Sequence, residues 1–399
     1  MTAPPDELRQ PEVPASGVFE RLASRPSIEN RLREEGEIAR GGMGAILRVW
    51  DDDLRRVLAM KVSLARPGAK GEAGTTSTDE RLLHRFLEEA QITGQLDHPG
   101  IVPVHELGID ATGRLYFTMP LVRGANLEQV FEWVKAGQEG WNRTRALNVL
   151  LKVCEAVGFA HQKGVVHRDL KPANVMVGRF GETYVMDWGL ARVLDRDDRR
   201  DLRLAVDAAA RSLVHTERAE GRTFDSPLAT MDGDIVGTPC YMPPEQARGE
   251  IEAIGPRSDV FAIGAMLYHL LSGSAPYLEP GASHAPLDVL RRLRDGAPVP
   301  IAELGRGVPE ELIAIADKAM ARDMDARYAS STELAEDLRA FLEDRVVRAH
   351  ASGPVAEFRT WFRRNRAAAL AGSAAVVLAA AWLVTTVLVQ ARANEQLTA

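Results

Sequence analysis

The chain has 399 residues, enough for two lobes or two domains, and its 45% hydrophobic and 26% charged residues are the ordinary profile of a globular protein. The formal net charge of −7 gives no reason to expect nucleic acid as a partner. The two cysteines, Cys154 and Cys240, are too few for a disulfide framework or a cysteine metal site, which favours a reducing, cytosolic environment.

The first part of the chain favours a tail followed by a small strand-rich lobe. Residues 1–33 are rich in proline and polar residues, so we expect a mobile tail and no signal peptide. Residues 34–119 then show short apolar runs typical of strands and one stretch with apolar residues at helical spacing. The expected strands are Glu37–Leu47, Val57–Val62, Ile101–Val104 and Leu115–Met119, and the expected helix is Asp79–Leu96.

The following residues, 123–345, are predicted to be mainly helical, because apolar side chains recur there every three or four positions. A small β-rich lobe followed by a larger helical lobe is an α+β arrangement. The expected helices are Thr144–Lys163, Asp259–Ser272, Glu310–Ala321 and Ser331–Glu343, the last with Ser331 as its N-cap.

The C-terminal part contains a segment without any charged residue, 367–389, which is long enough as a helix to cross a hydrocarbon layer of about 30 Å. A buried alanine-rich helix of a soluble domain is the alternative. Arginines and aromatics in 346–366, a predicted juxtamembrane linker, indicate that residues 1–366 lie in the cytoplasm and 390–399 outside. Gly372 and Ser373 would let two such helices approach, which makes a homodimer a further hypothesis.

Two features of the strand-rich lobe are suited to phosphate binding. The run from Ala39 to Ile46 is rich in glycine, which lets backbone N–H groups approach phosphate oxygens, although a plain hairpin turn explains it equally well. Lys61 lies on an apolar strand, with Glu89 of the expected helix as its natural ion partner and Glu88 as the alternative. A solvated surface lysine is the simpler interpretation of Lys61.

The segment His167-Arg168-Asp169-Leu170-Lys171-Pro172-Ala173-Asn174 is the strongest motif. It resembles the catalytic loop of eukaryotic-type (Hanks-type) protein kinases, with every signature position filled. Met186-Asp187-Trp188-Gly189 and the run Gly237–Glu245 resemble two further kinase motifs, and the glycine loop is most similar to the bacterial membrane-anchored Ser/Thr branch. The resemblance covers residues 34–345 and implies an α+β, two-lobe protein-kinase fold, which the transmembrane helix predicted from the charge-free segment 367–389 would follow.

The resemblance also implies a role for each matching residue. Lys61 would contact the α- and β-phosphates and pair with Glu89, Asp169 would orient the substrate hydroxyl and accept its proton, and Lys171 would neutralise the γ-phosphate. Asn174 and Asp187 would hold Mg²⁺, or alternatively Mn²⁺. The implied ATP site consists of Ala39, Arg40, Gly41, Gly42, Met43, Gly44, Ile46, Ala59, Lys61, the gatekeeper Met119 and the hinge residue Val122.

Structural and regulatory roles follow in the same way. Glu245 and Arg327 resemble an ion pair that anchors the activation segment, Asp259 opens a helix at another structural position, and Thr238 matches a threonine that couples this segment to Asp169. Arg168 beside a long activation segment indicates control by phosphorylation, and we expect autophosphorylation at Thr230, with Thr223 and Ser226 as alternatives. His98, His161 and His167 lack metal-type spacing and are interpreted as structural.

The sequence departs from the kinase pattern at a few positions. Ala39 replaces a glycine, Trp188 replaces a phenylalanine and Pro243 replaces an alanine, and none of these removes a group that does chemistry. The activation segment is also longer than usual by an insertion at about 195–234. This insertion is interpreted either as mobile or as a helix that docks on the kinase or a partner.

The sequence therefore predicts a Ser/Thr protein kinase with ATP and protein substrates as partners, attached to the bacterial inner membrane by a single pass and acting in signalling. Two alternatives are a membrane-tethered pseudokinase that only binds, and a phosphotransferase for small molecules. The presence of Lys61, Glu89, Asp169, Asn174 and Asp187 together argues against a pseudokinase, and the Gly237–Glu245 motif argues against a small-molecule enzyme.

Overall fold

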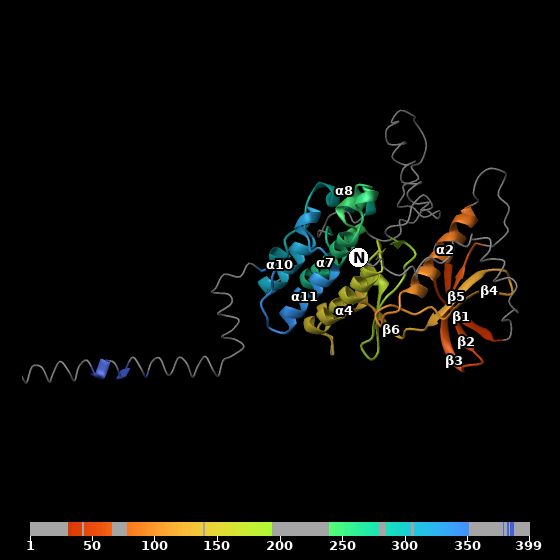
Figure 1. Cartoon of the computed structure of the whole chain (residues 1–399), viewed down its shortest axis with the longest axis horizontal. Helices are drawn as coiled ribbons and strands as arrows, with labels where there is room; N and C mark the ends of the chain where they lie inside the picture. Colours follow the sequence, from red (N-terminus) through yellow and green to blue (C-terminus); the bar gives the residue numbers. More distant parts are fainter. Residues whose placement is uncertain are drawn as a thin grey trace, which may run out of the picture.

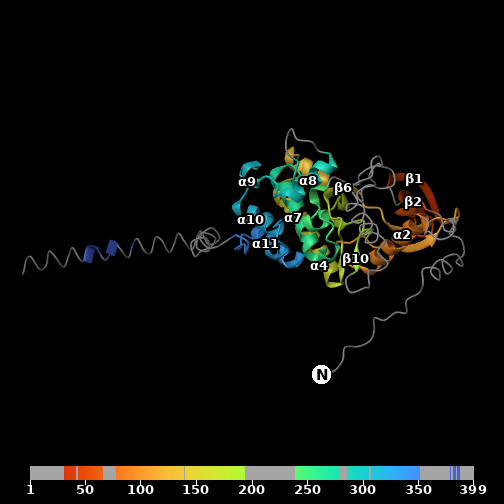
Figure 2. The ribbon, with the colours of Figure 1, turned by 90° about the horizontal axis from the view of Figure 1, so that it is seen from above.

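The computed structural model describes residues 31–41, 44–65, 78–138, 140–193, 239–278, 285–304 and 307–350, with a few more between 378 and 386. Two lobes are visible in these residues (Figure 1). A sheet with one long helix forms the N-terminal lobe, and a group of helices forms the C-terminal lobe. Seen from above, the two lobes lie side by side along the long axis of the molecule (Figure 2).

The N-terminal lobe is a five-stranded antiparallel sheet with the strand order β1-β2-β3-β5-β4. Helix α2 packs on it, with Phe86 of the helix 5.2 Å from the Phe117 ring of β5. Apolar side chains at helical spacing on α2 thus meet alternate residues of the central strands, as the two periodicities require. The elements are β1 Leu32–Arg40, β2 Gly44–Asp51, β3 Arg56–Ser63, α2 Thr78–Gln95, β4 Glu106–Ile109 and β5 Leu115–Pro120.

Two expected strands of this lobe differ from the structure, and the first of them, Glu37–Leu47, is divided between β1 and β2. Ile101–Val104 forms no strand, since Ile101 makes only an isolated bridge to Val185, and the edge strand β4 begins at Glu106 instead. Ile101 and Val102 are buried, so the run is apolar because it packs in the core. Pro103 interrupts it and has no N–H group to donate to a neighbouring strand.

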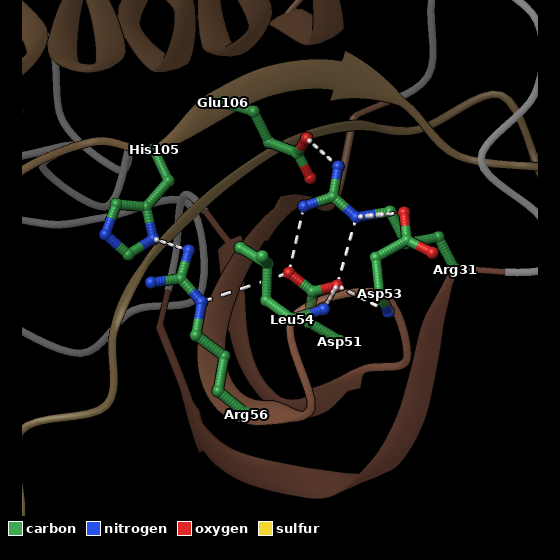
Figure 3. A network of polar contacts seen from close by, with 7 residues as sticks. All are labelled: Arg31, Asp51, Asp53, Leu54, Arg56, His105 and Glu106. Atoms are coloured by element: carbon green, nitrogen blue, oxygen red, sulfur yellow. Dashed lines mark hydrogen bonds and ion pairs between the residues drawn. The ribbon is translucent and has the colours of Figure 1, made fainter.

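A buried carboxylate, Asp51, and the arginine that binds it connect strands at one end of the sheet (Figure 3). Asp51, at the end of β2, is fully buried and accepts hydrogen bonds from Nε and Nη2 of Arg31 at 3.0 and 2.9 Å and from the backbone N–H groups of Asp53 and Leu54. Arg31 also reaches Glu106 of β4 at 3.3 Å. The hydrogen bond from Arg31 holds the pKa of Asp51 below its ordinary value. Arg31 therefore fastens the start of β1 to two other strands.

The C-terminal lobe is built around helices α4 and α7. Nearly every residue of α7 is buried, which is why its sequence is strongly apolar without a polar stripe. Gly264 lets α10 approach α7, since a Cβ there would lie 2.6 Å from that of Ala319. The helices are α3 Leu127–Lys135, α4 Arg143–Gln162, α6 Pro244–Ala247, α7 Pro256–Ser272, α8 Pro286–Asp295, α9 Ile301–Leu304, α10 Glu310–Ala319 and α11 Ser331–Leu342.

Short strands and 3₁₀ turns lie in the segments that connect the helices of this lobe. The strands form a three-stranded sheet in the order β6-β8-β9 and a two-stranded pair β10-β7. Their bounds are β6 Gly124–Asn126, β7 Val165–Val166, β8 Val175–Gly178, β9 Thr183–Val185 and β10 Arg192–Val193, and the 3₁₀ turns are η1 Pro172–Asn174, η3 Pro239–Tyr241, η4 Ile251–Ala253 and η5 Met324–Ala326.

The four helices expected in this lobe are all present, with shifted ends. Helix α7 begins at Pro256 rather than Asp259, and α10 ends at Ala319. The N-cap of α11 is Ser330, whose hydroxyl accepts the N–H of Glu333 at 3.2 Å, and not Ser331 as expected. Ser331 is buried inside the first turn. Both serines suit a cap chemically, so sequence alone did not separate them.

Most of the segment 367–389 lies outside the described residues, as does the insertion at 195–234. Within the part of the chain that the structure describes, no helix is both long enough and apolar enough to span a membrane. The described pieces between 378 and 386 are helical, and three of their large apolar side chains are exposed: Leu378, Trp382 and Val384.

Candidate active site

Lys61 of β3 meets two carboxylates at the junction of the lobes. Its Nζ lies 2.5 Å from Oε1 of Glu89 on α2 and 3.5 Å from Oδ1 of Asp187, which follows β9. Burial opposes the charged form of Lys61, but the two carboxylates outweigh it and raise its pKa above the ordinary value. The structure thus places Glu89 rather than Glu88 against Lys61, and Lys61 is a mostly buried cation.

The catalytic-loop residues surround one carboxylate. Oδ2 of Asp169 accepts hydrogen bonds from Nζ of Lys171 at 2.9 Å and from Nδ2 of Asn174 at 3.2 Å, and Asn174 also donates to the backbone oxygen of Asp169 at 2.8 Å. No hydrogen bond within the described residues uses Oδ1 of Asp169. One oxygen of this carboxylate is therefore fixed, and the other is available to a substrate.

Asp259 holds the backbone of this loop in place. It is buried at the start of α7 and accepts the N–H groups of His167 and Arg168 at 2.8 and 2.9 Å, as well as Nε2 of His161 at 2.8 Å. Burial favours the neutral acid, but the hydrogen bond from His161 and nearby positive charge outweigh it and lower the pKa of Asp259. Arg168 has φ 70°, a conformation that L-residues rarely adopt, so these bonds fix an unusual backbone geometry.

Asp187 and Asn174 offer oxygen ligands for a divalent cation. Asp187 has φ 58°, and its Oδ1 is buried without a hydrogen-bond partner in the described part of the chain, apart from the ammonium of Lys61 at 3.5 Å. Because the amide nitrogen of Asn174 donates to Asp169, its amide oxygen remains for another partner. The backbone N–H of Met186 bonds to the backbone carbonyl oxygen of Asn174 at 2.8 Å, which brings the two segments together, and a carboxylate oxygen and an amide oxygen are hard ligands of the kind Mg²⁺ prefers.

The glycine-rich run joins β1 to β2, and Ile46 of β2 pairs with Lys61 of β3. Gly44 is required by packing, because a Cβ there would lie 2.5 Å from the backbone oxygen of Val62. At Gly41 a Cβ would meet nothing within 4 Å, so open space lies beside the loop. Ala39 pairs with Ile46 across the two strands, and the ion pair of Arg40 with Glu37 is exposed. Gly42 and Met43 lie outside the described residues.

An apolar cluster links the two lobes near Lys61. Ala59 of β3 and Met119 of β5 are buried opposite each other, and the half-buried side chains of Ile46, Val122 and Met186 pack against their cluster. These residues come from β2, the connection after β5 and the residue just before Asp187. They form a surface suited to the flat apolar face of a base.

The ion pair of Glu245 with Arg327 lies on the other side of the catalytic loop. Both side chains are completely buried, with Nη1–Oε1 and Nη2–Oε2 distances of 2.8 and 2.9 Å, and Ser258 donates to Glu245 at 2.8 Å. Burial raises the pKa of Glu245, but the hydrogen bonds from Arg327 outweigh it and keep the carboxylate ionised. This pair joins α6 to the segment after α10. Thr230 and Thr238 lie outside the described residues.

Trp188 occupies the position where the sequence departs from the kinase pattern. Its indole is 1% exposed, packs against His167 with ring centroids 4.6 Å apart, and donates from Nε1 to the Val185 oxygen at 3.3 Å. His167 in turn contacts the Met186 oxygen through Nε2 at 3.0 Å. The larger ring is thus accommodated with its N–H group satisfied, as a buried indole requires.

Sequence reasoning gave no role to several residues beside Asp169. A small cavity of about 40 Å³ is lined by Asp169, Lys171, Tyr241, Met242 and Gln246, among others. Tyr241 and Met242 belong to the motif that ends at Glu245, so proximity to that motif was the available signal. The histidines interpreted as structural have the contacts described above, and His98 accepts the Gly100 N–H and stacks on Phe159.

Comparison with known proteins places this geometry in a family. Residues 32–338 match the model of the protein kinase domain. The chain is 32% identical over 323 residues to the serine/threonine-protein kinase PknD of Protochlamydia amoebophila (strain UWE25), covering 77% of this chain and 29% of that protein. It is 33% identical over 313 residues to the PknD of Chlamydia felis (strain Fe/C-56), covering 77% and 30%.

The chain belongs to the protein kinase domain family. The resemblance to Hanks-type kinases and the two-lobe fold are thereby confirmed. A third relative is the PknD of Chlamydia trachomatis serovar D (strain ATCC VR-885 / DSM 19411 / UW-3/Cx), which is 33% identical over 314 residues, covering 77% of this chain and 31% of that protein. The chain thus spans only about a third of the length of these relatives.

Proposed function

We propose that the chain is a serine/threonine protein kinase that transfers the γ-phosphoryl group of ATP to protein hydroxyl groups. The observation that carries this proposal is the Asp169 carboxylate, with Oδ2 held by Lys171 and Asn174 and Oδ1 without a partner among the described residues. Such a carboxylate can orient a substrate hydroxyl and accept its proton. The names of the relatives, all serine/threonine-protein kinases, support the choice of acceptor.

In the proposed reaction the substrate oxygen attacks the γ-phosphorus of ATP. The bond from this phosphorus to the β–γ bridging oxygen breaks, and ADP leaves with the electron pair. The hydroxyl proton passes to Asp169, while the Lys171 ammonium, 2.9 Å from that carboxylate, offsets negative charge on the transferred group. Lys61, kept in place by Glu89, binds the α- and β-phosphates.

The remaining parts of ATP have proposed partners as well. Asn174 and Asp187 would hold Mg²⁺ or Mn²⁺, which, when bound, would neutralise charge on the phosphates. The backbone of the glycine-rich loop would donate to phosphate oxygens. The adenine would lie against the apolar surface of Ile46, Ala59 and Val122 and bond to the backbone at Val122.

The test of this function is transfer of labelled phosphate from Mg-ATP to a generic basic protein, followed by analysis of the phosphorylated amino acids. We expect label on serine and threonine with the full chain and none with Asp169→Asn. A chain that binds ATP but transfers no phosphate would instead be a binding module, the pseudokinase alternative, and label on tyrosine alone would contradict the proposed acceptor.

We further propose that the kinase phosphorylates itself at Thr230, which lies outside the described residues. A phosphate of about −1.5 to −2 charge on this segment could order it against arginine. Mass-spectrometric mapping of active chain should find phosphate at Thr230, and it should be absent after expression of Asp169→Asn. Active enzyme without any phosphate between residues 195 and 238 would contradict this proposal.

Finally, we propose that residues 367–389 form a single membrane helix, with the kinase lobes on the cytoplasmic side of a bacterial inner membrane. The support is the lack of charge in this segment, the arginines before it, and the exposed Leu378, Trp382 and Val384. The hydroxyls of Thr385 and Thr386 donate to helix carbonyls one turn back, which satisfies them without water. The full chain should stay in the membrane pellet after alkaline carbonate washing, and a variant lacking 367–389 should not.

A further inference from the structure

A second cavity lies in the helical lobe and shares no lining residue with the cavity beside Asp169. Its volume is about 680 Å³, within the range of about 300–1,000 Å³ of cavities that hold ligands. The lining comes from four places: the second half of α3, the turn before α4, the C-terminal end of α7, and α9. Helices α7, α8 and α9 can be located in Figure 2.

The floor of this cavity is apolar and includes an aromatic side chain held in position. Phe131 and Leu270 are buried there, and Trp141 forms a wall. The guanidinium of Arg145 lies 4.1 Å from the centre of the Trp141 ring, and the Trp133 ring lies 5.9 Å away. Because Trp141 is packed in this way, the cavity offers a preformed surface to an apolar side chain.

The rim of the cavity carries two cationic side chains that form no ion pair with a carboxylate of the described residues. Lys135, exposed at the end of α3, has no ion pair there, and Arg143 donates only to the backbone oxygen of Gly307 at 3.2 Å. Glu132 is the acidic residue of the lining, so two cations face one anion. Burial, and after it the charge of Lys135, lowers the pKa of His269 to about 4.

One imidazole ring lies between this cavity and the active site. His269 belongs to the cavity lining, its Nδ1 lies 2.7 Å from the hydroxyl of Tyr241, and its ring packs edge-on against Phe131 at 5.0 Å. Tyr241 lines the small cavity beside Asp169. A molecule seated in the larger cavity would therefore touch a side chain that supports the wall of the other one.

We propose that this cavity, formed by α3, the turn before α4, α7 and α9, binds an acidic segment of a protein substrate. One apolar or aromatic side chain of the segment enters the floor beside Phe131 and Trp141, and neighbouring aspartates or glutamates pair with Lys135 and Arg143. The lining runs across four elements, which suits an extended segment. That the partner is a substrate rests on the proposed kinase function, whereas the binding itself requires no catalysis.

The test is a binding measurement with defined peptides on the full chain. The first probe is a fluorescein-labelled peptide of alternating glutamate and leucine or phenylalanine, without serine, threonine or tyrosine, and the second has lysine in place of each glutamate. By fluorescence anisotropy, we expect the acidic probe to bind at least tenfold more tightly than the basic one, and more weakly as salt is added. Equal binding of the two probes would overturn the proposal.

Variants localise the site. Lys135→Glu/Arg143→Glu should weaken binding of the acidic probe at least tenfold, and so should Leu304→Asp, which places a negative charge at an exposed position of the lining. The matched control is Arg291→Glu/Arg348→Glu, which changes the net charge equally at two exposed arginines that do not line the cavity. An equal loss in the control would mean non-specific attraction and would overturn the proposal.

Two further measurements distinguish peptide docking from kinase activity and from dimer formation. Phosphate transfer to a basic protein should be unchanged in the Lys135→Glu/Arg143→Glu variant, which distinguishes loss of the docking site from loss of kinase activity. If the full chain binds the probe but transfers no phosphate, the binding site stands and only its assignment to a substrate is removed. Sedimentation that reveals a dimer of the full chain abolished by the same variant would assign this face to a second copy and overturn the proposal.

Discussion

Replacement of Arg327 by methionine should destabilise the protein strongly, because it leaves a buried carboxylate without its partner. The guanidinium donates to both oxygens of Glu245 and to the backbone oxygens of Ala321 and Arg257 at 2.7 and 3.0 Å, and it lies 5.0 Å from the Phe261 ring centre. Breaking a buried ion pair in this way costs about 3–5 kcal/mol of unfolding free energy. For a domain of this size the melting temperature should fall by about 6–15 °C.

The pH dependence of this loss has a definite sign. Although burial raises the pKa of Glu245, Arg327 outweighs it and holds the pKa in the folded protein below the value of about 4.3 expected in the unfolded chain. The stabilisation by the pair is therefore fully present above that unfolded pKa and is lost as the pH falls through the folded one. In Arg327→Met burial alone raises the pKa of Glu245, so the difference in unfolding free energy between wild type and variant should be largest at high pH, decline as the pH falls through the raised pKa of the variant, and be smallest below the folded pKa of the wild type.

Urea unfolding followed by circular dichroism at several pH values measures this difference. The control is the double variant Glu245→Leu/Arg327→Met, which removes both charges and should be more stable than the single variant. A loss below about 1 kcal/mol for Arg327→Met, or a double variant no more stable than the single one, would refute the reasoning.

Four further predictions test other parts of the structure. Trp188→Phe removes the hydrogen bond to the Val185 oxygen and leaves a void, so equilibrium unfolding should show a loss of about 1–3 kcal/mol, and no loss would contradict the packing argument. Asp259→Asn cannot accept both loop N–H groups with its amide, so kcat should fall at least tenfold in steady-state kinetics while the KM for ATP changes little. Burial lowers the pKa of His269 to about 4 from 6.5, so the imidazole binds a proton less readily in the folded protein than in the unfolded chain. The wild type should therefore lose stability between pH 6.5 and 4 in thermal melts, and His269→Gln should show a smaller loss over that range. Lys61→Met should slow phosphate transfer about a hundredfold or more, and because it leaves the buried carboxylate of Glu89 without its partner it should also lower the melting temperature; a variant with wild-type activity would exclude the proposed contact of Lys61 with the phosphates.

The residues proposed to act in catalysis could be picked out from the sequence because they stand in contiguous motifs. Asp169, Lys171 and Asn174 lie within a few positions of one another, and a single loop with a 3₁₀ turn brings them together. The sequence left Glu88 open as an alternative partner of Lys61, and the resemblance to kinases pointed to Glu89, which the structure places against it. The kinase family itself was predictable from the order of these motifs, and the comparisons confirmed it.

Features that depend on packing between distant segments were not predictable. The apolar run at Ile101 looks like a strand, but Pro103 and burial in the core prevent it from pairing as one. Helix α8, Pro286–Asp295, combines five charged residues with an apolar face whose buried members are Val289, Leu290 and Leu293, and the sequence analysis missed it. The cavity beside His269 is built from four elements, and each of its residues alone is typical of an ordinary helix.

The most direct test of the account separates binding of ATP from its chemistry in Asp169→Asn of the full chain. Since Asp169 is proposed to act on the substrate hydroxyl and not on the nucleotide, the Kd for Mg-ATP should be within a few-fold of wild type, while the rate of phosphate transfer should fall about 10²–10⁴-fold. A variant that transfers phosphate at the wild-type rate would contradict the role of this carboxylate and with it the proposed mechanism.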